Sequence, residues 1–149
     1  MPRSQSPGGW SRSPPTYLDA AHNPDGAAAL AEALPALTGG RRLVACLAVL
    51  ADKDAAAMVA ALAPALDAAV CTEVPAAALQ AHGRPGARSR PAGELAALLA
   101  AAGVQAEADP DFDSALRRAR ELAAEPPEAV LLITGSHYAL APARTSLIT

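Results

Sequence analysis

Aromatic side chains and lysine are both scarce in this chain of 149 residues. Aromatic residues make up 3% of the sequence although hydrophobic residues reach 52%, and alanine is the most abundant residue. The hydrophobic content excludes a wholly disordered chain, and the small side chains predict helices that pack close to the layer beneath them. Lys53 is the sole lysine, which makes its position along the chain informative.

Cysteine, positive charge and long apolar runs are also in short supply. Cys46 and Cys71 are too few for a disulfide framework, and both lie in apolar runs typical of buried strands, so we expect reduced thiols. A net charge of −3 argues against a nucleic-acid partner. No segment reaches the ~18 uninterrupted apolar residues of a membrane helix, and residues 1–15 lack the apolar centre of a secretory signal. These absences predict a cytoplasmic protein with neither membrane nor nucleic acid as a partner.

Familiar nucleotide-binding motifs are missing as well. Lys53 is not preceded by glycines, so the sequence has no Gly-x-x-x-x-Gly-Lys-Ser/Thr loop, and no Gly-x-Gly-x-x-Gly follows the first expected strand. No pair of Cys or His residues has the spacing of a zinc site. The sequence therefore disfavours a phosphate-loop nucleotidase, a Rossmann-type dehydrogenase and a zinc protein.

The sequence does contain strand-like and helix-like segments that alternate about five times. Such alternation predicts an α/β fold in which a mostly parallel, Rossmann-like sheet of five strands carries helices on both faces. The apolar runs of strand length are 16–20, 43–50, 68–72, 104–108 and 129–134. An antiparallel edge strand near Gly9–Ser13 would raise the number of strands to six.

The domain organisation follows from composition. Residues 1–7 are rich in Pro, Ser and Arg and are expected to form a flexible lead-in, while 8–149 form a single domain. Residues 73–90 contain Gly, Pro and three Arg and are expected to be the longest irregular stretch. A loop of that length in a small domain is usually functional or mobile.

Polar side chains gather just after the expected strands. Because the carboxyl ends of parallel strands meet at one edge of a sheet, these side chains should lie near one another. They are Asp19–Asn23, Asp52 and Lys53, Thr72 and Glu73, Asp109, and Gly135–His137. A purely structural domain would not require this gathering, so this edge is the candidate functional site.

The segment Asp19–Pro24 joins a strand end to a helix N-terminus, where free backbone N–H groups and the helix dipole favour anions. His22 could contact a phosphate or a nucleotide sugar, and Asp19 could bind a ribose or orient His22. The alternative is a helix capped by Asn23 beside a surface histidine.

Two other segments also follow strands. Lys53 lies between Asp52 and Asp54, where its ammonium could pair with a phosphate, or where these residues could form only a solvated turn and a helix cap. The Gly135-Ser136 pair is typical of a small anion-binding turn, because Gly permits close backbone approach and Ser donates a hydrogen bond. Taken alone, this pair is common after strands.

Together these segments resemble the C-terminal domain of the Mur ligase superfamily, in particular that of bacterial folylpolyglutamate/dihydrofolate synthases. Asp19–Pro24 is similar to an Asp-Gly-Ala-His-Asn-Pro segment, with Ala20 in place of Gly. Ala48–Asp54 is similar to Gly-x-Leu-x-Asp-Lys-Asp, with Ala48 in place of Gly. The other counterparts of the family pattern are Thr72, Ala87–Ser89 for Pro-Arg-Ser/Ala, Thr134–Ser136, Tyr138 and Arg144. The ordered set covers nearly the whole chain.

The resemblance implies a reaction and a role for each site residue. In the family, MgATP phosphorylates the carboxylate of a pteroate or folate tail, and the amine of L-glutamate attacks the acyl phosphate to give an amide. The residues that would face ATP are Asp19, His22 and Asn23. Lys53 and Asp52 would lie at an interdomain cleft near phosphate or glutamate. The residues that would bind glutamate are Arg88, Ser136 and Thr72, with Arg90 as the alternative to Arg88.

The resemblance also implies partners outside this chain. In the family, the phosphate loop, the magnesium ligands and a modified lysine lie in the N-terminal and central domains, over which the C-terminal domain closes. We therefore expect ATP and Mg²⁺ to be held mainly by those domains, and the isolated chain to bind ATP weakly and to be inactive.

Two other functions remain open from the residues. The chain could be a detached, non-catalytic module that binds a nucleotide or a protein, or a domain of another Mur-type amide ligase. The Asp52–Asp54 and Gly135-Ser136 segments favour the folate enzymes over the other Mur-type ligases.

Overall fold

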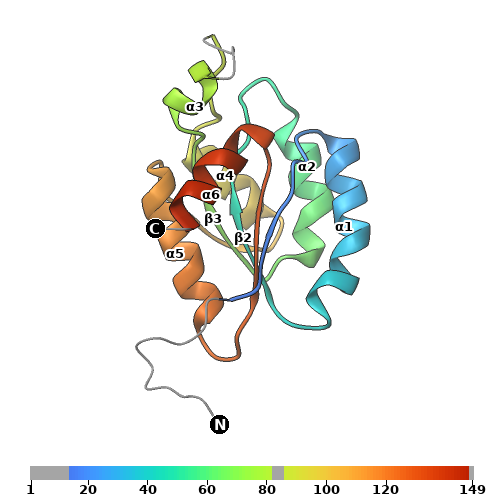
Figure 1. Cartoon of the computed structure of the whole chain (residues 1–149). Helices are drawn as coiled ribbons and strands as arrows, with labels where there is room; N and C mark the ends of the chain where they lie inside the picture. The colour runs from blue at the N-terminus through green and yellow to red at the C-terminus, as the bar shows by residue number, and fades with distance from the viewer. Residues whose placement is uncertain (1–13, 82–85, 148–149) are drawn as a thin grey trace.

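Five parallel strands form the sheet at the centre of the molecule (Figure 1). The computed structural model describes residues 14–81 and 86–147, and the strands in it follow the order β1-β5-β2-β3-β4. They are β1 (Thr16–Leu18), β2 (Leu43–Leu47), β3 (Ala68–Cys71), β4 (Gln105–Ala108) and β5 (Val130–Thr134). Every pairing is parallel, which confirms the predicted α/β class. The edge strand expected near Gly9–Ser13 and the lead-in 1–7 lie outside the described residues.

Strands β2 and β5 lie at the centre of the sheet and are paired along their whole length. All ten residues of the two strands are buried. Because helices cover both faces of this part of the sheet, both strands appear in the sequence as continuous apolar runs without alternation. The outer strand β4 has a mixed pattern of exposed and half-buried residues, which is why its sequence signal is weaker.

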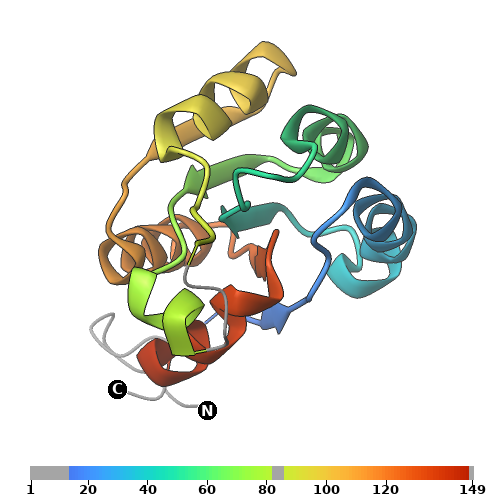
Figure 2. The same cartoon turned by 90° about the horizontal axis from the view of Figure 1, so that it is seen from above.

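Helices cover the two faces of the sheet in separate groups (Figure 2). One face carries α1 (Pro24–Thr38), α2 (Ala55–Leu62) and α4 (Ala92–Ala101). The other face carries α5 (Phe112–Ala124), α6 (Leu140–Leu147) and the short α3 (Ala76–Ala81). None of the helices within residues 14–81 and 86–147 is long and apolar enough to cross a membrane.

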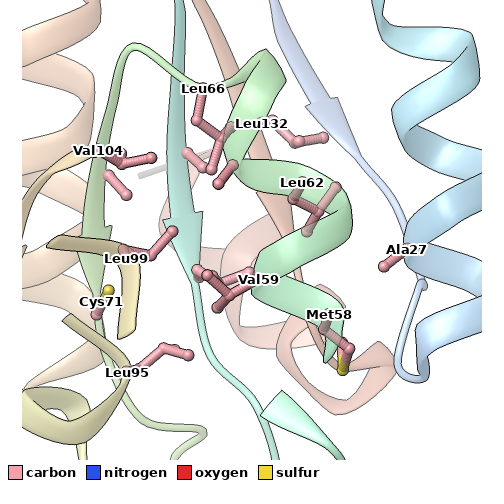
Figure 3. Packing of buried hydrophobic residues seen from close by; sticks show 14 of the residues in the cluster. Ala27, Met58, Val59, Leu62, Leu66, Cys71, Leu95, Leu99, Val104 and Leu132 are labelled. Carbon is pink, nitrogen blue, oxygen red and sulfur yellow. The ribbon is translucent and has the colours of Figure 1, made fainter. Parts of the chain in front are cut away.

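The core beneath α2 and α4 is built from leucine and smaller side chains (Figure 3). Val59 and Leu62 from α2 and Leu95 and Leu99 from α4 share one buried cluster with Leu132 of β5. Alanine lets neighbouring helices approach closely, as at the fully buried Ala27 of α1. The expected core of small side chains is confirmed.

Side-chain caps set the start of three helices. Asn23 Oδ1 accepts from the N–H of Gly26 at 2.7 Å at the start of α1, with Pro24 at the first helical position. Asp54 caps α2, because its Oδ1 accepts from the N–H of Ala57 at 3.0 Å. Helix α5 begins at Phe112 because Asp111 is its cap, accepting from the N–H of Ser114 at 2.9 Å.

The described part of the stretch 73–90 contains a helix that the sequence did not predict. This helix is α3, whose first turn is closed by the N–H groups of Ala78 and Leu79 on the carbonyl of Pro75. Leu79 is buried against the second face of the sheet. A helix of six residues is too short to produce a helical repeat in the sequence, which explains why the prediction of an irregular stretch was wrong here.

Candidate functional site

The polar segments predicted to meet do lie at the carboxyl edge of the sheet. In the observed strand order, residues 19–23 follow β1 and residues 135–137 follow its neighbour β5. The turn 48–54 follows β2, and Thr72 and Glu73 follow β3. Parallel pairing therefore brings four loops from distant parts of the sequence to one edge.

The loop 19–23 is shaped by its own polar side chains. Asp19 Oδ1 accepts from the N–H of Ala21 at 2.8 Å. His22 Nδ1 lies 3.0 Å from the carbonyl oxygen of Ala20. Because a carbonyl can only accept, Nδ1 carries the proton in this contact, and a neutral His22 keeps Nε2 as an acceptor. Asn23 uses its carbonyl oxygen for the helix cap and retains its amide NH₂ as a donor.

The loop after β5 is held against the loop after β1. The N–H of Gly135 donates to the carbonyl of Ala21 at 3.1 Å. The ring of His137 meets that of His22 edge-on with centroids 5.9 Å apart, and it lies 4.0 Å from the ring of Tyr138. Three polar rings thus line the junction of the two loops.

Gly135 cannot be replaced by a larger residue without a rearrangement. Its φ is +107°, in the left-handed region that favours glycine. A Cβ at this position would overlap the carbonyl oxygen of Ala48, at the end of β2. The next residue, Ser136, is buried, and its Oγ accepts from the N–H of Tyr138 at 3.2 Å, which starts the short η3 turn (His137–Ala139).

The two arginines considered for the glutamate role differ in their surroundings. Arg90 Nη2 donates to the carbonyl oxygens of Ala51 at 3.0 Å and Lys53 at 2.8 Å, so its guanidinium is bound within the protein. Arg88 is exposed, and its guanidinium has no hydrogen-bond partner among the described residues. Of the two, Arg88 is the one whose guanidinium remains available to a ligand.

A cavity of about 830 Å³ opens beside Arg88. Its apolar lining includes Val74, Leu79 and Phe112, and its acidic lining is Glu73, Asp111 and Asp113. A pocket with one guanidinium and several carboxylates can bind the carboxylate and the ammonium of an amino acid together. The sequence did not identify Asp111 and Asp113 as part of this cavity. Both nevertheless follow β4, at the edge of the sheet where polar site residues are expected.

Thr72 and Ser136 do not line that cavity. Both are buried, and the Thr72 hydroxyl has no hydrogen-bond partner among the described residues. The hydroxyl of Thr134, at the end of β5, is buried and unpartnered in the same way. A buried hydroxyl without a partner is unfavourable, and here two of them lie on either side of the end of β2.

Lys53 and Asp52 lie on the turn after β2, with Lys53 half-buried and Asp52 exposed. Lys53 lines a smaller cavity of about 510 Å³ between α2 and α4, together with Arg90 and Glu94. Lys53 and Arg88 therefore line two different cavities.

Neither cysteine is a reactive thiol, and the acidic residues form no metal cluster among the described residues. Burial raises the pKa of both Cys46 and Cys71 to about 12, so these thiols stay protonated and are not nucleophiles. Within residues 14–81 and 86–147, no three His, Cys, Asp or Glu residues are grouped so that they could hold a metal ion.

The match to a family model agrees with this geometry. Residues 10–137 match the model of the Mur ligase glutamate ligase domain. The chain belongs to this family. The match includes the loops after all five strands.

Known relatives are folate enzymes. A dihydrofolate synthase/folylpolyglutamate synthase of Mycobacterium tuberculosis is 52% identical over 62 residues, which are 41% of this chain and 13% of that protein. The structure of a Mycobacterium tuberculosis folylpolyglutamate synthase complexed with ADP is 33% identical with a TM-score of 0.72, covering 95% of this chain and 32% of that one. A bifunctional folylpolyglutamate synthase/dihydrofolate synthase with manganese, AMPPNP and L-glutamate bound is 27% identical with a TM-score of 0.69, covering 97% and 32%. The chain thus spans about a third of the length of these structures.

Proposed function

We propose that this chain is the amino-acid-binding C-terminal part of an ATP-dependent ligase that adds L-glutamate to dihydropteroate or folate. The observation that carries the proposal is the meeting of the Asp19–Asn23, Lys53 and Gly135–His137 loops at one edge of the sheet, in a chain of the glutamate ligase domain family. The related structures that contain ADP, or AMPPNP with L-glutamate, support the same class of ligands.

The loop after β1 forms one wall of the nucleotide site in this proposal. Asp19 fixes the loop through the N–H of Ala21, which sets the position of His22. His22 offers Nε2 to the nucleotide, and Asn23 offers its amide NH₂. The N-terminal end of α1 lies directly behind them and favours the negative charge of phosphate groups.

Glutamate binds in the cavity beside Arg88. Arg88 pairs with a glutamate carboxylate in the cavity beside α3, where a guanidinium fits the two oxygens of the carboxylate. The neighbouring Glu73, Asp111 and Asp113 attract the ammonium group. Lys53 and Asp52 face the cleft near phosphate or glutamate, and the buried Ser136 and Thr72 complete the glutamate side through small movements of their loops.

A partner ATPase region supplies the rest of the site. We assign the phosphate loop and the Mg²⁺ ligands to the N-terminal and central domains of the same ligase; among the described residues here, no three His, Cys, Asp or Glu are grouped so that they could hold a metal ion. ATP phosphorylates the folate carboxylate there, and the glutamate amine then displaces phosphate to form the amide. The contribution of this chain is to bind glutamate and to close the nucleotide site, which excludes water from the acyl phosphate.

Reconstitution tests the proposal. The chain is mixed with the separately produced N-terminal and central domains of a folylpolyglutamate synthase, and ADP release is measured with and without L-glutamate. We expect glutamate-dependent ADP release that neither part shows alone, and its loss with His22→Ala. A mixture that shows no glutamate-dependent turnover would favour a non-catalytic binding module instead. We call this mixture the reconstituted ligase.

A further inference from the structure

Arg90 is bound to the turn that carries Lys53. Its Nη2 donates to the carbonyl oxygens of Ala51 at 3.0 Å and Lys53 at 2.8 Å. The Arg90 side chain is 24% exposed, and its Nε is buried without a partner among the described residues. A buried N–H without a partner is costly, so the two carbonyl contacts are the interactions that favour keeping the guanidinium at this place.

The backbone beside Arg90 is paired with the same turn. The N–H of Arg90 donates to the carbonyl of Val49 at 2.7 Å, and the N–H of Ala51 donates to the carbonyl of Arg88 at 2.8 Å. Leu50 and Ser89 form an isolated antiparallel bridge between these two hydrogen bonds. Backbone pairing thus holds the chain as far as Ala51, and the Arg90 side chain extends the contact to Lys53.

The geometry of this contact favours an arginine over a lysine. One guanidinium nitrogen serves two carbonyl oxygens, which a planar group of fixed shape can do at a low cost in side-chain entropy. A lysine at this position would keep the charge but present a flexible, strongly hydrated ammonium. The ion pair of Arg90 with Glu94 is long, at 3.5 Å, and Glu94 is exposed, so it contributes little.

We propose that Arg90 is a positioning residue that holds the Lys53 turn in the conformation that presents the lysine to phosphate or glutamate. Its effect on the ligase reaction passes through Lys53 and not through direct contact with substrate. The inference rests on the proposed function, in which Lys53 lies at the interdomain cleft. The two nearby arginines then have different roles: Arg88 binds the ligand, and Arg90 holds the turn in position.

The contact itself is tested on the isolated chain by amide hydrogen exchange. The N–H of Lys53 donates to the carbonyl of Leu50 within the turn, so its exchange reports on the conformation of the turn. We expect Arg90→Met to speed exchange at Lys53 roughly tenfold, with the strands unaffected, and Glu94→Gln to leave it unchanged. Unchanged exchange in Arg90→Met would overturn the proposal.

The route through Lys53 is tested by a double-mutant cycle in the reconstituted ligase. Arg90→Met should lower kcat/KM for glutamate about tenfold in the wild-type background. In the Lys53→Met background the same substitution should lower it less than about twofold, because the residue through which Arg90 acts is gone. An equal loss in both backgrounds would overturn the proposal. So would full activity of Arg90→Lys, since charge alone would then be sufficient.

The outcomes separate the inference from the proposed function. A wild-type mixture without glutamate-dependent turnover contradicts the proposed function and, with it, the route through Lys53. Normal turnover that falls with Lys53→Met but not with Arg90→Met contradicts the inference alone.

Discussion

The ring of His22 contacts the ring of His137 edge-on at 5.9 Å, and this contact joins two loops from opposite ends of the sequence. The hydrogen bond from Gly135 to Ala21 runs alongside it. Because β1 and β5 are neighbours in the sheet, their carboxyl ends bring the Asp19–Asn23 loop and the Gly135-Ser136 turn together. The edge is therefore preorganised for the function proposed above.

The first prediction concerns Gly135. Gly135→Ala would place a Cβ against the carbonyl oxygen of Ala48 and would force a left-handed φ on alanine. We expect a loss of roughly 2–4 kcal/mol in the free energy of unfolding, from overpacking together with backbone strain. Urea denaturation of the isolated chain measures it.

Gly39→Ala is the matched control for Gly135→Ala. Gly39 has a φ of +60°, but a Cβ there would meet nothing within 4 Å. Only the backbone cost of about 1–2 kcal/mol should remain. Equal losses of unfolding free energy at both positions would show that the close approach to Ala48 adds nothing to the cost of Gly135→Ala.

Asn23 combines a cap with a proposed ligand contact, and two substitutions separate them. Asn23→Ala removes the acceptor for the N–H of Gly26 and should destabilise the chain by about 1 kcal/mol. Asn23→Ser keeps a capping oxygen and should retain nearly all of the stability. Both should raise the KM for ATP in the reconstituted ligase, because both remove the amide NH₂. A normal KM in Asn23→Ser would limit Asn23 to a structural role.

Arg88 is expected to control glutamate affinity. Arg88→Lys keeps the charge but loses the two-pronged geometry, so we expect the KM for glutamate in the reconstituted ligase to rise about tenfold while kcat changes little. The thermal midpoint should not move, because Arg88 is exposed. Arg117→Lys, at an exposed position of α5, is the control and should leave the KM unchanged.

The pairing of Glu107 with Arg118 should appear in the pH dependence of stability. Arg118 donates to both carboxylate oxygens of Glu107, at 2.9 and 3.0 Å, and these hydrogen bonds hold the pKa of Glu107 below its ordinary value of 4.5. A carboxyl whose pKa is lower in the folded state adds stability above the unfolded pKa and loses it as the pH falls through the folded pKa.

The matching measurement compares wild type with Arg118→Met. Because both side chains are more than a third exposed, the difference in unfolding free energy should stay below about 1 kcal/mol near neutral pH. It should shrink further below about pH 4. A difference that grows as the pH falls would contradict this reading of the pair.

Much of this molecule could be predicted from its sequence, because its signals are local. The buried strands β2 and β5 are continuous apolar runs, and Asn23-Pro24 marks the start of α1. The gathering of polar residues at one edge followed from parallel pairing alone. These features depend on neighbours in the chain or on a general rule of sheet topology.

The different surroundings of Arg88 and Arg90 could not be predicted in this way. They depend on the pairing of segment 86–91 with the end of β2, which neither composition nor periodicity signals. The cavity lining from Asp111 and Asp113 depends in the same way on the loop after β4 and α3 sharing one cavity. Both relationships join residues far apart in the sequence.

One measurement tests the central claim that this edge of the sheet binds glutamate. Amide chemical shifts of the isolated chain are followed by NMR as L-glutamate is added to millimolar concentrations, with L-lysine as the control ligand. We predict saturable shifts confined to residues 72–76, 86–91, 111–113 and 134–138, weaker with L-lysine, which lacks the side-chain carboxylate, and abolished by Arg88→Met. Shifts that map to another surface, or that persist unchanged in Arg88→Met, would contradict the account.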